Sequence, residues 1–440
     1  MGGFSVLNFG CRASQADGAA IEGQLTAAGW QPAGAGSAPA LVVLNSCTVT
    51  SSADQDLEKA VRRLRREQPQ ARILITGCYA QRAPERMARL DGVTWVVGNS
   101  DKDRIAEIVG PPELTPMDRT TETSYHAQIH VRDMFLRREF FSAPVGDAPS
   151  GRARPNLKVQ DGCNNRCSFC VIPAVRGASR SAPADWVIAQ VRQLASRYAE
   201  VVLTGVNLGR WGREQGAGRQ LTDLLRRILR ETPVQRLRLS SIEPMDWTDD
   251  LIDLLAHEPR LARHVHAPLQ SGSDAVLRRM YRKYRPRHYR DRLERAFARM
   301  PDAAFGADVM AGFPGETDQE FLETCDFVRA LPFTYLHVFT YAERPGTAAA
   351  HRPDPVPVSV RKERTRILRA IGEEKNRQFR QRMIGQPLSV VTLGDREALS
   401  SNYIPVRLAA PCPAQQIRVI RPVALTPGGV AEATLLPVLV

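Results

Sequence analysis

Residues 162–170 read Gly-Cys-Asn-Asn-Arg-Cys-Ser-Phe-Cys. The three cysteines in this stretch, Cys163, Cys167 and Cys170, follow the spacing Cys-x3-Cys-x2-Cys. Three thiolates on one short loop can bind three irons of a cubane iron–sulfur cluster. The fourth iron then has no protein ligand, and an open position on a metal is where a substrate or cofactor binds. The spacing therefore predicts a catalytic cluster with one open iron.

A structural zinc site is the competing interpretation of these cysteines. Structural zinc normally has four ligands, often in two pairs, and no fourth Cys or His lies near the three in the sequence. The loop also follows the stretch Leu157–Gln160, which we predict to be the first strand of a barrel-like series. Active-site loops follow the strands of such barrels, so the pattern favours the catalytic cluster.

Strand and helix patterns alternate on the carboxyl side of this loop. Short apolar runs between helical stretches are typical of parallel strands joined by crossover helices. Six such units are too few for a closed eight-unit barrel, so we expect an open (β/α)6 barrel over residues 153–383 that ends in a long helix, Val358–Met383. The other expected strands are Val201–Thr204, Arg236–Ser240, Val265–Pro268, Phe305–Met310 and Leu336–Tyr341.

The chain before the loop alternates in the same way, so the expected class is α/β. Residues 1–110 predict an open parallel α/β domain, and prolines punctuate residues 111–152, which we expect to be a linker. Residues 384–440 show short apolar runs between Gly and Pro turns, typical of a small β-barrel-like module. The expected N-terminal strands are Phe4–Phe9, Leu41–Leu44, Ile73–Thr76 and Trp95–Val97, and the expected helices are Ile21–Ala28 and Asp54–Arg66.

A second set of cysteines is spread over the N-terminal domain. Cys11, Cys47 and Cys78 each follow a predicted strand and precede a helix. The carboxyl ends of parallel strands face one crevice, so these thiols are expected to converge, and convergent thiolates favour a soft metal or cluster. The alternative is that each is a small buried hydrophobic residue. We expect that structural role for the remaining two, Cys325 and Cys412.

Composition limits the class of protein. The 440 residues carry a formal charge of +13, most of it from Arg, which favours contact with phosphate backbones but could also reflect a coding preference for Arg. No apolar run approaches the roughly 18 residues of a membrane span, and the first residues lack the features of a signal peptide. We therefore expect a cytoplasmic protein without a membrane partner.

Longer motifs around both cysteine sets resemble the radical S-adenosylmethionine (SAM) methylthiotransferase family, over nearly the whole chain. The C-terminal module lies where that family has an RNA-binding TRAM domain, with a poor sequence match. Around Cys47 and Cys163 the chain is most similar to the branch that acts on N6-threonylcarbamoyladenosine, at position 37 beside the tRNA anticodon. The matching stretches are residues 45–50 (Asn-Ser-Cys-Thr-Val-Thr), 76–81, 162–173, 176–177, 180–181, 240–244 (Ser-Ser-Ile-Glu-Pro), 266–273 and 308–317.

The resemblance implies two 4Fe-4S clusters and SAM as both radical source and methyl donor. The cluster on Cys163, Cys167 and Cys170 would generate a deoxyadenosyl radical that removes hydrogen from adenine C2. The cluster on Cys11, Cys47 and Cys78 would carry the sulfur that is methylated and transferred. An aromatic C–H is inert to acid–base chemistry, so a cofactor must supply the difficult step.

Four residues are expected to contact SAM. Phe169 matches the aromatic residue that flanks the adenine in the family, and Glu243, Gln270 and Asp308 fall near the carboxyl ends of barrel strands, where ligand contacts are expected. Residues 278–285 mix cations and aromatics, which suits a nucleic-acid groove but equally a solvated helix face. The expected partners are the tRNA anticodon loop, an electron donor such as flavodoxin or ferredoxin, and a sulfur source.

Four alternatives stay open at this point. Within the family, the substrate could be isopentenyladenosine in tRNA or a ribosomal protein side chain. Outside that activity, the chain could be an iron–sulfur RNA-binding or sensor protein without turnover, or a radical enzyme that uses the second cluster for electron relay.

Overall fold

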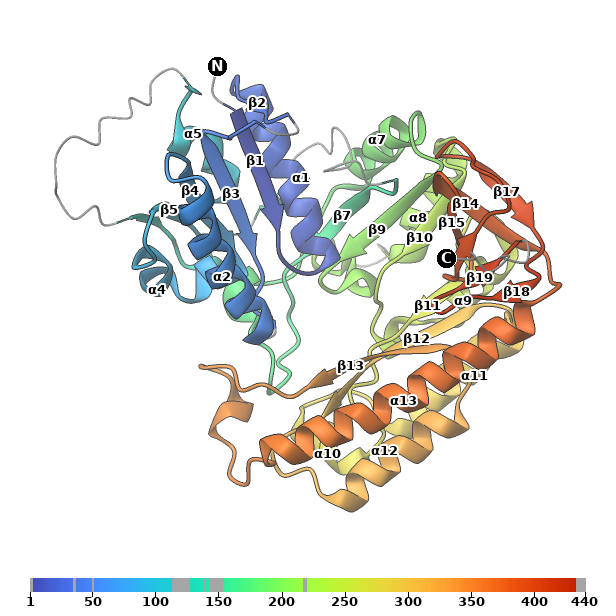
Figure 1. Ribbon diagram of the computed structural model, residues 1–440. Coiled ribbons are helices and arrows are strands. Elements are labelled where there is room, and N and C mark those ends of the chain that lie inside the picture. The colour runs from blue at the N-terminus through green and yellow to red at the C-terminus, as the bar shows by residue number, and fades with distance from the viewer. Residues whose placement is uncertain are drawn as a thin grey trace, which may run out of the picture. The chain divides into compact units, whose positions relative to one another are not determined.

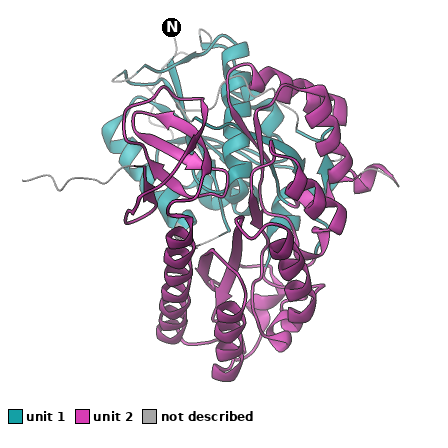
Figure 2. Ribbon diagram, turned by 90° about the vertical axis from the view of Figure 1, so that its right-hand side faces the viewer, with its two compact units in different colours: residues 1–165, 170–183, 204–206 teal, residues 166–169, 184–203, 207–440 magenta. Residues whose placement is uncertain are grey.

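The computed structural model describes residues 3–34, 37–49, 51–112, 127–137, 139–141, 153–216 and 220–432. The chain forms two compact units, shown in different colours in Figure 2. Unit 1 comprises residues 1–165, 170–183 and 204–206, and unit 2 comprises residues 166–169, 184–203 and 207–440.

Unit 1 is built on a parallel sheet with the strand order β2-β1-β3-β4-β5-β6 (Figure 1). Every neighbouring pair in this sheet is parallel. Its strands are β1 (Gly3–Asn8), β2 (Gln31–Pro32), β3 (Leu41–Ser46), β4 (Arg72–Gly77), β5 (Val93–Val97) and β6 (Gln128–His130). Its helices are α1 (Arg12–Ala27), α2 (Ser51–Glu67), α3 (Cys78–Arg82), α4 (Pro84–Ala88) and α5 (Ile105–Val109).

Apolar cores lie on both faces of this sheet. Alternate residues of β3 point to opposite sides: Val42 packs with Leu57 of α2, and Val43 packs with Ile21 of α1. A strand buried on both faces has no polar alternation, which is why Leu41–Leu44 is continuously apolar in the sequence.

Two features of unit 1 differ from the sequence expectation. Helix α1 begins at Arg12, directly after Cys11, whereas the apolar pattern indicated a helix from Ile21. Small residues such as Gly18 fill the first turns, because a Cβ at Gly18 would lie 2.0 Å from the Asn8 side chain, and small residues give little periodic signal. Strand β6 lies within the expected linker and pairs with β5; residues 113–126, 138 and 142–152 of that linker lie outside the described residues.

The carboxyl end of unit 1 contains the start of the predicted barrel. Strand β7 (Asn156–Asp161) pairs antiparallel with the short strand β8 (Arg180–Ser181). Helix α6 (Ile172–Arg176) lies between them in the chain.

Unit 2 contains the remaining barrel strands. Strand β9 (Glu200–Gly205, whose last two residues belong to unit 1) pairs in parallel with β10 (Arg236–Leu239). Strands β11 (His264–His266), β12 (Ala304–Ala311) and β13 (Tyr335–Thr340) form a second parallel sheet. The accompanying helices are α7 (Ala184–Ala195), α8 (Leu221–Glu231), α9 (Asp249–His257), α10 (Asp274–Arg279), α11 (Pro286–Arg299), α12 (Asp318–Ala330) and α13 (Val358–Met383).

A six-stranded C-terminal sheet completes unit 2, in the order β17-β14-β15-β16-β19-β18. Its core includes Phe379 and Met383 of α13 together with Cys412. Its strands are β14 (Leu388–Gly394), β15 (Glu397–Ser400), β16 (Pro405–Arg407), β17 (Ile417–Ile420), β18 (Ala424–Leu425) and β19 (Val430–Ala431). The predicted mixed α/β class with a C-terminal sheet module is confirmed. None of the described helices combines the length and apolar character that a membrane span requires.

Candidate iron–sulfur centres

The three clustered cysteines lie on the loop between β7 and α6. Gly162, at the start of this loop, has a φ of +70°. A Cβ at this position would lie 1.9 Å from the carbonyl oxygen of Ala178, so only glycine fits. The amide of Cys163 donates to the carbonyl oxygen of Gly177 at 3.0 Å. The backbone therefore fixes the entry to the loop.

The centre of the loop is anchored by Ser168. Its amide donates to the carbonyl oxygen of Met280 at 3.1 Å, and its hydroxyl donates to the carbonyl oxygen of Arg279 at 2.8 Å. Phe169 is partly buried against an apolar cluster that includes Met280 and Phe313. The residue predicted to flank the SAM adenine is thus held by packing.

A buried guanidinium lies against the middle cysteine. Arg282 is 7% exposed, and its Nη1 donates to the Sγ of Cys167 at 3.0 Å. Its Nη2 donates to a carboxylate oxygen of Glu243 at 2.5 Å. Burial alone would lower the pKa of Arg282, but its interactions with Tyr284, Glu243 and Cys167 hold that pKa well above its usual value. A permanent cation therefore adjoins this thiol.

The structure places Glu243 and Gln270 in different surroundings. Glu243 follows β10 and reaches Cys167 through Arg282. Gln270 follows β11 and has a φ of +64°, which is rare for a residue with a side chain. Its amide donates to the carbonyl oxygen of Asp308, and its own carbonyl oxygen accepts from the amide of Met310. Such a constrained backbone commonly accompanies functional sites.

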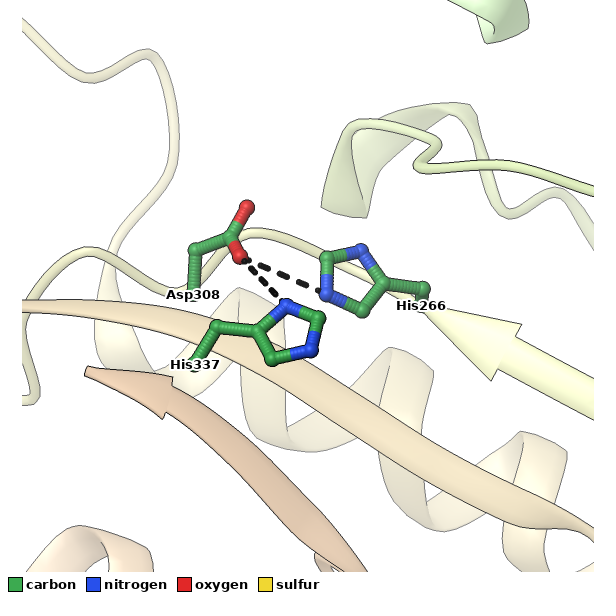
Figure 3. Close-up of side chains that lie close together, drawn as sticks. All are labelled: His266, Asp308 and His337. Atoms are coloured by element: carbon green, nitrogen blue, oxygen red, sulfur yellow. Dashed lines mark hydrogen bonds and ion pairs between the residues drawn. The ribbon is translucent and has the colours of Figure 1, made fainter. Parts of the chain in front are cut away.

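Asp308, on β12, faces two imidazoles (Figure 3). One carboxylate oxygen lies 3.4 Å from Nε2 of His266 and 3.3 Å from Nδ1 of His337. Burial would raise the pKa of Asp308, but the two histidines lower it well below its usual range. The carboxyl group is therefore ionised.

Residues 278–285 do not form one face of a helix. Helix α10 ends at Arg279, and the next residues alternate between the interior and the surface. Tyr284 is 2% exposed and its hydroxyl donates to the carbonyl oxygens of Pro268 and Leu269. Tyr281 is 56% exposed. This segment thus contains the buried Arg282, which contacts Cys167, and two exposed residues, Arg278 and Tyr281.

The second set of cysteines converges in unit 1. Cys11, Cys47 and Cys78 follow the adjacent strands β1, β3 and β4, whose carboxyl ends lie within one residue of the same register. A Cβ at Gly10 would lie 2.9 Å from the Sγ of Cys47, so the turn before Cys11 passes directly over Cys47. Burial, reinforced by the charges of Cys11 and Cys78, raises the pKa of Cys47 to about 12. Three ionised thiolates this close need a cationic partner, which a metal cluster would supply.

A buried network of charges supports Cys78. Arg176 donates from Nε to the Sγ of Cys78 at 3.3 Å and pairs with Asp17 and Asp161, each at 2.9 Å. Lys102 lies 2.9 Å from Asp17, and Lys158 pairs with both aspartates. The guanidinium of Arg176 thus lies directly against the Sγ of Cys78, a placement that fits a negatively charged cluster.

Sequence reasoning did not identify these supporting residues. Arg176 was noted as part of a motif, whereas Asp17, Lys158 and Arg282 had no assigned relation to a thiol. A lysine buried by tertiary contacts has no distinguishing signal in one sequence. The two cysteines outside the sets, Cys325 and Cys412, are both buried. Cys412 packs in the core of the C-terminal sheet, and its thiol donates to Oε1 of Gln416 at 3.2 Å.

Two family models match the chain. The model described as the radical SAM superfamily matches residues 157–328, and the one described as uncharacterized protein family UPF0004 matches residues 4–98. The first range contains the Cys-x3-Cys-x2-Cys loop, and the second contains Cys11, Cys47 and Cys78.

Relatives match over most of the chain. The threonylcarbamoyladenosine tRNA methylthiotransferase MtaB of Rickettsia prowazekii is 34% identical over 92% of this chain and 90% of its own length. The protein of the same name from Bacillus subtilis is 34% identical over 87% and 83%. The tRNA-2-methylthio-N(6)-dimethylallyladenosine synthase of Syntrophotalea carbinolica is 32% identical over 90% and 89%.

Solved structures are similar in fold. The radical SAM methyltransferase TsrM from Kitasatospora setae superposes with a TM-score of 0.57 at 17% identity, over 80% of this chain and 77% of that one. The methylthiotransferase relatives match over most of this chain, including both regions that the family models cover. This match over the whole chain shows the family. This chain belongs to the radical SAM methylthiotransferases.

Proposed function

We propose that this enzyme inserts a methylthio group at C2 of N6-threonylcarbamoyladenosine at position 37 of tRNA. The observation that carries the proposal is the identity of 32–34% over most of the chain with three methylthiotransferases named for that nucleoside. The motifs around Cys47 and Cys163 support the same branch. A tRNA substrate makes the cytoplasm the expected compartment.

Two 4Fe-4S clusters are the proposed resident groups, one on Cys163, Cys167 and Cys170 and one on Cys11, Cys47 and Cys78. When bound, the first supplies reductive cleavage of SAM for removal of the C2 hydrogen, and the second supplies the sulfur atom. The residues present fit both groups: each set offers three thiols, and each has a buried guanidinium on one sulfur.

The protein's own residues position the reactants. We propose that Phe169 provides an apolar wall for the SAM adenine and that Glu243 and Gln270 contact its polar groups. Phe169 is held by packing and Glu243 by Arg282, so neither side chain has to be ordered when SAM binds. Preordering of this kind reduces the entropic cost of binding. A flavodoxin or ferredoxin and a separate sulfur source complete the proposed system.

Nucleoside analysis tests the proposal. Protein with both clusters is incubated with SAM, a reductant and tRNA from a strain that lacks methylthio modification, and the digested nucleosides are analysed by mass spectrometry. We expect a mass gain of one methylthio group on the threonylcarbamoyl nucleoside. Binding to that tRNA should weaken steeply with salt, because neutralised phosphates release counterions.

The second candidate substrate is dimethylallyladenosine in tRNA. It is favoured by the synthase of Syntrophotalea carbinolica, at 32% identity. A mass gain on this nucleoside alone would support the proposed chemistry but would identify dimethylallyladenosine as the substrate. No gain on any nucleoside, from protein that forms deoxyadenosine, would favour a ribosomal protein side chain, and failure to form deoxyadenosine would favour a sensor.

A further inference from the structure

Three adjacent strands of unit 2 direct potential metal ligands to one point. His266 ends β11, Asp308 lies on β12 and His337 lies on β13. Asp308 and His337 are direct partners in the register of β12 and β13. Figure 3 shows both imidazoles turned toward the same carboxylate oxygen. One ligand atom from each residue lies within 4.8 Å of the others.

The spacing of these atoms is compatible with metal coordination as well as with hydrogen bonding. The two nitrogen–oxygen distances are 3.4 Å and 3.3 Å, beyond the 2.7–3.2 Å typical of N–H···O hydrogen bonds. Donors bound at roughly 2.0–2.1 Å to a tetrahedral ion lie about 3.3 Å apart. The two observed nitrogen–oxygen separations therefore match two edges of a tetrahedral metal site.

A neighbouring hydroxyl orients His266 for coordination. The Oγ of Ser241 lies 2.8 Å from Nδ1 of His266. With that hydroxyl as acceptor, Nδ1 carries the ring proton and Nε2 presents its lone pair to the other two residues. Nε2 is buried and, although it lies 3.4 Å from the Asp308 carboxylate, it makes no hydrogen bond among the described residues. Metal-binding histidines normally have such a partner on the second nitrogen.

We propose that His266, Asp308 and His337 bind one divalent transition-metal ion, a site separate from both cysteine sets. Two imidazoles and one carboxylate are ligands common to zinc and non-haem iron(II) centres that keep open positions. The side chain of His337 is 51% exposed, so the site can be reached by an ion and by a further oxygen ligand. The ligand set carries one negative charge, which leaves a bound divalent ion with a net positive charge.

Zinc provides a probe that is distinct from cluster iron. The cluster-loaded full chain is dialysed anaerobically against micromolar Zn²⁺, and zinc and iron per chain are measured by mass spectrometry. We expect about one more zinc per chain in the unmodified protein than in Asp308→Asn or His337→Ala. Iron content should be the same in all three.

His257→Ala is the matched control. His257 is exposed on α9 and its Nδ1 contacts the backbone of its own helix, so its removal should not change zinc content. Because His337 is half exposed, His337→Ala should fold, and unchanged iron content verifies this. Equal zinc in His337→Ala and the unmodified protein, or no zinc bound by either, would overturn the proposal. This result is independent of the nucleoside assay.

Discussion

The guanidinium of Arg282 connects Cys167 to Glu243, donating to the Sγ of Cys167 at 3.0 Å and to the Glu243 carboxylate at 2.5 Å. Hydrogen bonds to cluster sulfurs help to set the reduction potential. A cation at this position stabilises the reduced form, which carries one more negative charge. Arg282 therefore should raise the potential of the proposed SAM-cleaving cluster.

Arg282→Gln should lower that potential by at most about 60 mV, because only the part of the hydrogen-bond energy that differs between the oxidised and reduced cluster shifts the potential, and about 1.4 kcal/mol corresponds to 59 mV for one electron. A redox titration followed by electron paramagnetic resonance measures it. Arg278→Gln is the control, because the side chain of Arg278 is 67% exposed. Equal potentials in the two variants would show that the contact has no electrostatic role.

Iron content tests the number of clusters. Anaerobically reconstituted protein should hold about eight irons, and replacing Cys163, Cys167 and Cys170 with Ala should leave about half. The reason is that the other three thiols belong to a separate sheet edge in unit 1. Replacing Cys325 with Ala serves as the control. Full iron retention in the triple variant would contradict two separate clusters.

Variants of the two cysteine sets should lose different activities. Cys47→Ala should still form deoxyadenosine from SAM but add no methylthio group, because the proposed sulfur-supplying cluster would lose a ligand. Cys167→Ala should lose both activities. Chromatography of deoxyadenosine and nucleoside mass spectrometry measure the two products. A normal methylthio product from Cys47→Ala would exclude its cluster as the sulfur carrier.

Glu22 on α1 should make stability depend on pH. Burial raises its pKa to about 7, whereas an unfolded Glu titrates at roughly 4.3. Between these two pKa values the folded chain binds more protons than the unfolded chain. The contribution of Glu22 to stability is therefore fully present below about pH 4.3 and is lost as the pH rises through 7. Glu22→Gln should therefore raise the free energy of unfolding at pH 8 by about 1–2 kcal/mol, allowing for partial exposure.

Thermal unfolding at pH 5 and pH 8 measures this difference. The gain in melting temperature should be clear at pH 8 and small at pH 5. Glu107→Gln is a suitable control, because Glu107 is exposed on the surface of the same unit. Equal gains at both pH values would point to packing rather than to titration.

Local sequence patterns predicted much of the architecture. The helix expected over Val358–Met383 has those bounds in α13, and each expected barrel strand overlaps an observed one. The cysteine loop was recognisable because its ligands lie within eight residues of one another. Only the second half of α1 (Arg12–Ala27) was predicted, because the small residues in its first turns give a weak hydrophobic periodicity.

The sequence by itself determined which cysteines are the candidate cluster ligands, since spacing and strand ends follow from covalent order. Only the tertiary structure decided what surrounds them. Arg282 is 115 residues from Cys167 in the chain, and Arg176 is 98 residues from Cys78. The cluster of His266, Asp308 and His337 likewise depends on the register of three strands. A charged side chain is buried only where partners from elsewhere in the chain offset the cost of its desolvation. A single sequence does not show which of these partners come into contact.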